Sequence, residues 1–198
     1  MFTGIVEEMG TVAAIGEVDG GWEMTLEASV VLDGTKLGDS IAVNGTCLTV
    51  TEMSADTFKI GMAPETLSRT NLGDLSVGSS VNLERSVPAN GRMDGHFVQG
   101  HVDGTGVIRE FREDEDSLWV TVEAAPEIMR YVVTKGYIAV DGTSLTVVDV
   151  FDDAFTFMLV AYTQQHIVIP QKQVGDRVNL EVDILGKYIE KFVATRQS

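Results

Sequence analysis

An internal repeat constrains this chain more than any other feature. Residues 40–50, SIAVNGTCLTV, return at 137–147 as YIAVDGTSLTV, and eight of the eleven aligned residues are identical. The same offset of 97 residues places VNLE at 81–84 over VNLE at 178–181. Near the start, residues 4–6 align with 100–102 at an offset of 96. A period of this length is too long for a solenoid repeat and matches a small domain. The sequence therefore predicts two copies of one domain.

Composition narrows the classes of function. The 198 residues include 30 acidic and 14 basic side chains, a net charge of −16. This argues against a nucleic-acid partner, because binding phosphate backbones needs a basic face. Cys47 is the only cysteine, so no intrachain disulfide can form, which is compatible with a reducing compartment. No apolar run approaches the ~18 residues of a membrane span, and residues 1–10 lack signal or transit character. We expect a cytoplasmic protein, or a plastid one if a transit peptide has been removed.

Alternating patterns predict short β-strands. In the first copy they cover 4–15, 22–28, 40–43, 46–52, 56–62 and 80–85, with a short helix over 64–70. Asn44-Gly45 is the signature of a type I′ hairpin turn. Six short antiparallel strands favour a small closed barrel, which leaves no exposed edge. The predicted fold is all-β, with a first barrel in 1–86, a linker in 87–97 and a second barrel in 98–183.

The tail, residues 184–198, belongs to neither copy. Apolar residues recur there at helical spacing, at Leu185, Tyr188, Ile189, Phe192 and Val193. A terminal α-helix is therefore predicted, and its apolar stripe must be covered. Either it folds onto a barrel, or it meets the same helix of other subunits.

The two copies differ mainly at polar positions. The exchanged pairs are Cys47 and Ser144, Asn44 and Asp141, Ile5 and His101, Glu65 and Tyr162, and Gly61 and Met158. Such differences within one frame suit two similar ligands handled in different roles, although drift after duplication is the alternative. Cys47 taken alone is more often a small buried hydrophobe than a nucleophile.

Metal and cofactor sites have little support in the sequence. His96 and His101 lie five residues apart, and such residues face opposite sides of an extended strand. No Cys/His cluster, P-loop or dinucleotide fingerprint is found in the sequence. We expect neither a metal nor a cofactor.

Several segments together resemble one enzyme family over essentially the whole chain. They are MFTGIVE, VNGTCLTV, ETLSRTNLGDL, GHFVQGHVD, KGYIAVDGTSLTV and VGDRVNLEVD. They are similar to riboflavin synthases of the α-chain type, the eukaryotic branch in particular. The resemblance implies two six-stranded Greek-key β-barrels and a trimerisation helix over 184–198. One departure is Asp94, where a glycine is expected, and we expect it to have only a modest effect on the linker.

The resemblance also implies a function. Such a transferase dismutates two molecules of 6,7-dimethyl-8-ribityllumazine into riboflavin and 5-amino-6-ribitylamino-uracil, without metal or cofactor. It works as a homotrimer, with each active site between the first barrel of one subunit and the second barrel of its neighbour. The alternatives are a non-catalytic lumazine-binding antenna and a flavin carrier of the same fold.

Candidate site residues follow from the matched segments. The candidates for chemistry are Cys47 and Ser40 near the first barrel, and His101, Asp141 and Ser144 near the second. The substrate-binding candidates of the first copy are Gly4, Ile5, Val6, Cys47, Leu48, Thr49, Gly61, Met62, Ala63, Pro64, Glu65 and Thr66. Those of the second copy are Gly100, His101, Val102, Lys135, Ser144, Leu145, Thr146, Met158, Leu159, Val160, Ala161, Tyr162 and Thr163.

Overall fold

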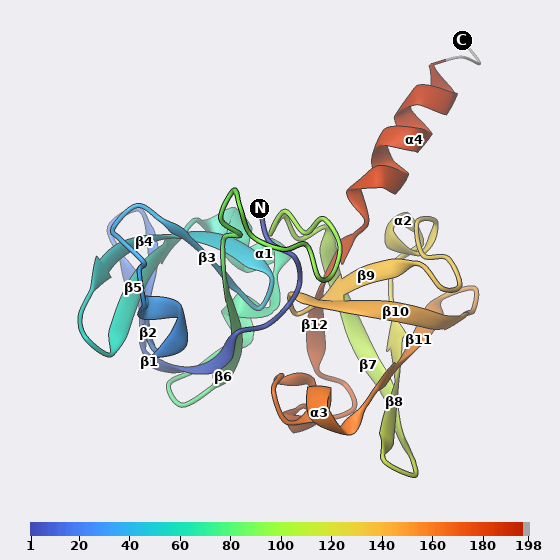
Figure 1. Cartoon of the computed structure of the whole chain (residues 1–198), viewed down its shortest axis with the longest axis horizontal. Helices are drawn as coiled ribbons and strands as arrows, with labels where there is room; N and C mark the ends of the chain where they lie inside the picture. Colours follow the sequence, from blue (N-terminus) through green and yellow to red (C-terminus); the bar gives the residue numbers. More distant parts are fainter. Residues whose placement is uncertain (196–198) are drawn as a thin grey trace.

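The computed structural model describes residues 1–195 and shows two β-barrels side by side, with a helix that extends beyond them (Figure 1). The first barrel comprises β1 (Glu8–Val18), β2 (Gly21–Glu27), β3 (Ser40–Val43), β4 (Thr46–Met53), β5 (Thr57–Met62) and β6 (Ser80–Arg85). The second comprises β7 (Gly104–Asp114), β8 (Ser117–Glu123), β9 (Tyr137–Val140), β10 (Thr143–Val150), β11 (Ala154–Leu159) and β12 (Arg177–Val182). The strand order around the first is β1-β2-β5-β4-β3-β6, and the second follows the same circuit. The predicted pair of six-stranded barrels is confirmed.

Short helices connect the strands. They are η1 (Val30–Leu32), α1 (Pro64–Arg69), η2 (Asn71–Asp74), α2 (Pro126–Met129), α3 (Ala161–Gln164) and η3 (Ile169–Gln171). In α1 and α2 a proline occupies the first turn, where its missing N–H costs nothing.

Each barrel has its own core. Along β2 the side chains of Met24 and Leu26 are fully buried while their neighbours face outward, as the period-two pattern predicts. They pack with Phe58 and Ile60 of the neighbouring strand β5. Side chains of this size stabilise the fold by roughly 1.5–3 kcal/mol each on burial. Either barrel therefore holds together through its own apolar interior.

The repeated hairpins form the contact between the barrels. Both residues of the predicted type I′ turn, Asn44-Gly45, have positive φ, 44° and 77°, and so do those of its counterpart Asp141-Gly142, 44° and 78°. The two turns pack backbone against backbone, so a Cβ on Gly45 would lie 2.6 Å from the backbone nitrogen of Gly142. The segment that reveals the duplication in the sequence thus lies at its approximate two-fold axis.

Two asparagines hydrogen-bond these turns across the approximate two-fold axis. Asn82 Nδ2 donates to the carbonyl of Asp141 at 2.8 Å, and Asn179 Nδ2 donates to the carbonyl of Asn44 at 2.8 Å. Each asparagine is contributed by the barrel opposite the turn that it binds. These buried carbonyls are satisfied only when the two barrels are together.

The chain start differs from the prediction. A strand was expected from residue 4, but β1 begins at Glu8. Gly4 has a φ of +77°, which interrupts an extended strand, and Phe2 instead forms an antiparallel bridge with Val98 at the start of the second half. Phe2, Val98, Ala42 and Ala139 make a small apolar cluster where the two halves meet. The first residues therefore bind to the other half of the chain rather than extend β1.

The terminal helix α4 (Ile184–Ala194) is as predicted in type, while residues 196–198 of the expected segment lie outside the described residues. Asp183 caps its start by accepting a hydrogen bond from Leu185 N. Its base is held by Lys187, which pairs with Asp103, and by Glu190, which binds Arg130 and Tyr131.

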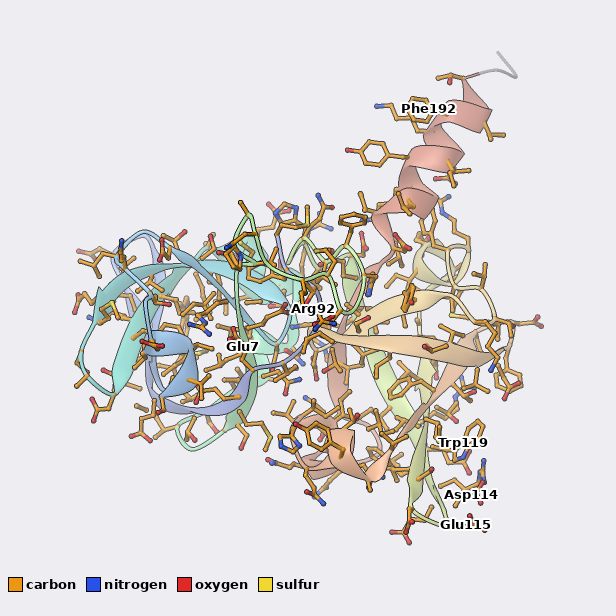
Figure 2. The ribbon with its side chains drawn as sticks, in the orientation of Figure 1. Glu7, Arg92, Asp114, Glu115, Trp119 and Phe192 are labelled. Carbon is orange, nitrogen blue, oxygen red and sulfur yellow. The ribbon has the colours of Figure 1, made fainter. Side chains whose placement is uncertain are left out.

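The apolar stripe of α4 does not fold onto a barrel in the chain. Leu185, Tyr188, Ile189, Phe192 and Val193 are 52–64% exposed, and Figure 2 shows Phe192 on the part of the helix that extends beyond both barrels. Across residues 1–195, no helix is long and apolar enough to cross a membrane.

Candidate substrate sites on the two barrels

Two equivalent places on the barrels carry the exchanged pair Cys47 and Ser144. Cys47 lies on β4 and Ser144 on β10, each the second residue after its hairpin turn and each partly exposed. Cys47 N donates to the carbonyl of Gly100 at 2.9 Å, and Ser144 N donates to the carbonyl of Gly4 at 2.7 Å. Each strand is therefore completed by a segment from the other half of the chain.

Because each segment crosses to the other barrel, the candidate residues that lie together in the structure differ from those that share a copy in the sequence. The sequence groups 4–6 with Cys47 and 100–102 with Ser144, because they share a copy. In the structure, 4–6 run beside Ser144 and 100–102 run beside Cys47. His101, expected near the second barrel, thus belongs to the site around Cys47, where its side chain is exposed. Sequence offsets cannot show the exchange, because both pairings preserve the alignment.

The crossing segments pass so close that only glycine fits. Gly4 and Gly100 have φ values of +77° and +79°, a region that side chains rarely adopt. A Cβ on Gly4 would lie 2.6 Å from Ser144 Cβ, and one on Gly100 would lie 2.6 Å from Cys47 Cβ. These glycines let backbone groups of the segments lie directly at the two sites.

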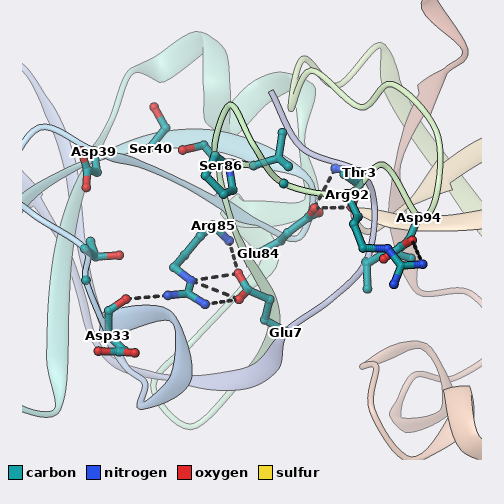
Figure 3. A pocket seen from close by; sticks show the side chains of 16 residues that line it. Thr3, Glu7, Asp33, Asp39, Ser40, Glu84, Arg85, Ser86, Arg92 and Asp94 are labelled. Atoms are coloured by element: carbon teal, nitrogen blue, oxygen red, sulfur yellow. Dashed lines mark hydrogen bonds and ion pairs between the residues drawn. The ribbon is translucent and has the colours of Figure 1, made fainter.

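Two buried glutamates hold the crossing segments. Glu84 on β6 accepts a hydrogen bond from Thr3 N at 2.7 Å (Figure 3). It also accepts one from Gly4 N at 3.0 Å. Glu181 on β12 accepts from Gly100 N and His101 N, both at 2.9 Å. Burial raises the pKa of Glu84 to about 7 and raises the pKa of Glu181 above its usual range. The candidate sets from the sequence omit both residues, although their recurrence in the repeated VNLE strand was a usable signal.

On the strands, the side chains of the remaining substrate-binding candidates point alternately into the barrel cores and outward. Leu48, Met62, Leu145 and Leu159 point into the barrel cores, so only their backbone groups can reach a ligand. Those with exposed side chains or surfaces are Ile5, Thr49, Gly61, Ala63, Pro64, Glu65, His101, Lys135, Thr146, Met158, Val160, Ala161 and Tyr162. Val6, Thr66, Val102 and Thr163 are half-buried. Apart from Ile5, His101 and Lys135, the exposed members lie on or just after neighbouring strands, β4 with β5 and β10 with β11.

The two sites differ in the chemistry beside the exchanged pair. Ser144 Oγ is 2.7 Å from His96 Nδ1, and the His96 ring stacks on Tyr137 with 5.1 Å between ring centroids. Burial lowers the pKa of His96, which favours the neutral imidazole that can accept a proton. The position equivalent to Tyr137 in the first barrel is Ser40, so this stack has no counterpart there. In the sequence, His96 stands out only as a possible metal ligand, so its pairing with Ser144 was not predicted.

The rims of the sites differ as well. On α1, Glu65 pairs with Arg69 at 2.8 Å, one helical turn later. At the equivalent positions of the second copy, the ring of Tyr162 stacks on His166 with 4.1 Å between centroids. One site is therefore bordered by an ion pair and the other by aromatic rings.

Asp141 does not lie at either site. It is fully buried between the barrels, where its Oδ1 accepts from Asn71 Nδ2 and Asn179 N, both at 2.8 Å. Its Oδ2 is 3.4 Å from Lys172 Nζ. Burial raises the pKa of this carboxyl. The expectation of a catalytic Asp141 is thus corrected by its placement: the exchange of Asn44 for Asp141 distinguishes the two turns of the barrel contact.

A cleft on the first barrel is not lined by Cys47 or Ser144. It has a volume of roughly 560 Å³ and lies against the first barrel and the linker, lined among others by Thr3, Ser40, Glu84 and Arg85 (Figure 3). Asp94, the departure noted in the sequence, is on its rim and pairs with Arg92 at 3.3 Å. The side chains of Cys47 and Ser144 are each partly exposed outside this cleft. Among residues 1–195, no group of three or more His, Cys, Asp or Glu side chains is arranged to bind a metal.

Comparison with known proteins agrees with the duplicated architecture. The family model for the lumazine binding domain matches twice, over residues 3–86 and 99–183. Riboflavin synthase of Schizosaccharomyces pombe is 50% identical, with 98% of this chain and 94% of that protein covered. Riboflavin synthase of Actinobacillus pleuropneumoniae is 48% identical over 98% of this chain and 90% of its own length.

The fold also has solved counterparts. The crystal structure of LumP complexed with riboflavin superposes with a TM-score of 0.85 at 24% identity, covering 92% of this chain and 99% of LumP. LumP complexed with 6,7-dimethyl-8-(1'-D-ribityl) lumazine gives a TM-score of 0.83 at 23% identity, with the same coverage. These likenesses concern the fold. The relatives at 48–50% identity and the two matched domains show that this chain belongs to the riboflavin synthase family.

Proposed function

We propose that the chain catalyses the dismutation of two molecules of 6,7-dimethyl-8-ribityllumazine into riboflavin and 5-amino-6-ribitylamino-uracil. The observation that carries this is the pair of equivalent sites with one backbone frame and different polar groups, at Cys47 and at Ser144. Two copies of one substrate need two similar sites, and their opposite roles as donor and acceptor of four carbons need unequal ones. The enzyme relatives match over nearly the whole chain.

Positioning supplies much of the rate in such a reaction. An exocyclic methyl of the lumazine is acidic because its anion delocalises into the ring, so modest acid–base help is sufficient. Holding two reactants in the reactive geometry can lower the barrier by roughly 7–11 kcal/mol. Backbone groups of the crossing segments suit the pyrimidine edge, and hydroxyls such as those of Thr49 and Thr146 suit a ribityl chain. The Ser144–His96 pair is the group best placed to relay a proton.

Assembly is the second part of the proposal. Ile5, Val160 and Tyr162 near Ser144 are 46–73% exposed, and the stripe on α4 is exposed too. Exposed apolar surface of this kind indicates an interface. We infer a homotrimer joined by α4, in which the site at Cys47 of one subunit faces the site at Ser144 of its neighbour. This transferase works in the cytoplasm without metal or cofactor.

A non-catalytic lumazine binder is the alternative, favoured by the likeness of the fold to LumP. Incubation with 6,7-dimethyl-8-ribityllumazine in the presence of a metal chelator separates the two. The enzyme produces riboflavin continuously and consumes two lumazines for each one. A protein that binds the lumazine stoichiometrically and makes no riboflavin would contradict the proposal.

A further inference from the structure

We propose that Glu84 and Glu181 are positioning residues, each of which sets the geometry of the substrate site on the barrel opposite its own. The inference rests on the proposed function for the identity of the ligand. The contacts that support it stand on the structure alone, and they form two chains of hydrogen bonds of the same design.

The first chain runs from β6 to the second barrel. Glu84 Oε1 accepts from the backbone nitrogen and the hydroxyl of Thr3, at 2.7 and 3.0 Å, and Oε2 accepts from Gly4 N at 3.0 Å. The carbonyl of the same Gly4 then accepts from Ser144 N at 2.7 Å. A first-barrel carboxylate thus fixes the segment that forms the wall of the second-barrel site.

The second chain runs from β12 to the first barrel. Glu181 Oε1 accepts from Gln99 N at 2.6 Å, and Oε2 accepts from Gly100 N and His101 N at 2.9 Å. The carbonyl of Gly100 accepts from Cys47 N at 2.9 Å. The two glutamates occupy the same position of the repeat, so the arrangement is reciprocal: each barrel holds the segment that completes the other site.

The ionised carboxylate is the form that suits these backbone donors. Glu84 and Glu181 are only 7% and 4% exposed, so in the ionised form, which is present above their raised pKa, their charge is held by hydrogen bonds rather than by water. Each receives three donors from its segment, and a carboxylate has acceptors only. Glutamine would turn an N–H donor toward a backbone N–H, losing a charge-assisted hydrogen bond and adding a repulsion.

The reaction rate of a cysteine thiol placed at each site can report on the two sites separately. Cys47 is the single thiol of the chain and lies against Gly100, so its reaction rate with an aromatic disulfide reagent reports the first site. The thiol introduced by Ser144→Cys in a Cys47→Ser background reports the second site. In each background, Glu84→Gln and Glu181→Gln are compared with the parent, and each variant is the matched control for the other.

Each glutamine variant should change the reactivity only of the thiol on the barrel opposite the substituted glutamate. Glu181→Gln raises the reactivity of Cys47 about tenfold, the change expected for the loss of one charge-assisted hydrogen bond, while Glu84→Gln leaves it unchanged. Glu84→Gln raises the reactivity of the thiol at position 144, while Glu181→Gln leaves it unchanged. Riboflavin serves as the probe ligand and should slow the reaction of each thiol in the parent protein. Glu181→Gln should abolish this protection at Cys47, and Glu84→Gln should abolish it at the thiol at position 144. If a glutamine variant fails to fold, Glu84→Asp and Glu181→Asp, which keep the charge but shorten its reach, must show the same crossed pattern.

Equal increases at both thiols would show general destabilisation and overturn the proposal, and so would no increase at either. The thiol rates do not depend on turnover. A wild-type chain that makes no riboflavin would therefore refute the proposed function while leaving these outcomes readable.

Discussion

At the scale of single residues, the two sites share their backbone and differ in their proton chemistry. Ser144 has an imidazole 2.7 Å away, at His96, and that ring is fixed by stacking on Tyr137. Cys47 occupies the equivalent strand position opposite Ala42, as Ser144 does opposite Ala139. The asymmetry therefore lies in the groups around the exchanged pair as much as in the exchange of sulfur for oxygen.

This difference predicts unequal costs of substitution. Ser144→Ala removes the hydroxyl that His96 contacts, so the single-turnover rate should fall about 100-fold, within the range of acid–base contributions, with little change in substrate affinity. Cys47→Ser keeps the shape of its site and should change the single-turnover rate much less. Single-turnover kinetics beside equilibrium binding measure both. A larger rate loss in Cys47→Ser would instead assign the proton chemistry to the first site.

The buried carboxyl of Glu84 predicts a pH dependence of stability. Its pKa is raised from 4.5 to about 7 by burial, so between these values the folded protein binds more protons than the unfolded chain. Stability contributed by Glu84 is fully present below pH 4.5 and is lost as pH rises to about 7. The free energy of unfolding of the wild type, minus that of Glu84→Gln, should decrease over this window. A difference that is flat with pH, measured by urea unfolding, would exclude a raised pKa.

At the scale of elements, the hairpins were predictable and their partners were not. Asn44-Gly45 specifies a type I′ turn locally, because both residues tolerate positive φ. The helix at 64–70 and the strand at 80–85 follow from similarly local rules. That 4–6 crosses to Ser144, or that Asp141 is buried beside Lys172, depends on the approximate two-fold packing of the barrels, which no local pattern encodes.

The packed turns predict a graded effect of alanine substitution. Gly78 has a φ of +90° and open space around it, so Gly78→Ala should cost about 1–2 kcal/mol of stability from strain alone. Gly45→Ala adds a Cβ only 2.6 Å from the backbone of Gly142, so it should cost clearly more and weaken the barrel contact. Urea unfolding of the two variants gives the comparison. Equal losses would mean that the turns separate without cost.

At the scale of the whole molecule, apolar side chains on the terminal helix and beside Ser144 are exposed in the single chain. Cys47 and Ser144 are partly exposed, and α4 exposes an apolar stripe while its base is held by the ion pairs Lys187–Asp103 and Glu190–Arg130. The repeated motifs and the resemblance allowed the fold, the domains and the family to be expected from the sequence. The reciprocal exchange of segments required the structure.

Truncation tests the role of α4. A chain that ends at Asp183 keeps both barrels, whose cores do not include α4, and should therefore fold. Light scattering should give the mass of a monomer for this chain and of a trimer for the full one. A truncated chain that remains trimeric would place the subunit contacts on the barrels instead.

The central claim, that two unequal barrel sites meet across a subunit boundary to hold two substrate molecules, is tested most directly by mixing disabled subunits. Thr49 and Thr146 are exposed at matched strand positions, so Thr49→Arg should block only the first site and Thr146→Arg only the second. Each variant alone should make no riboflavin. Trimers reassembled from equal amounts of both should recover about one quarter of wild-type activity, because intact first and second barrels then meet at random. Verified mixed trimers that remain inactive would contradict the account.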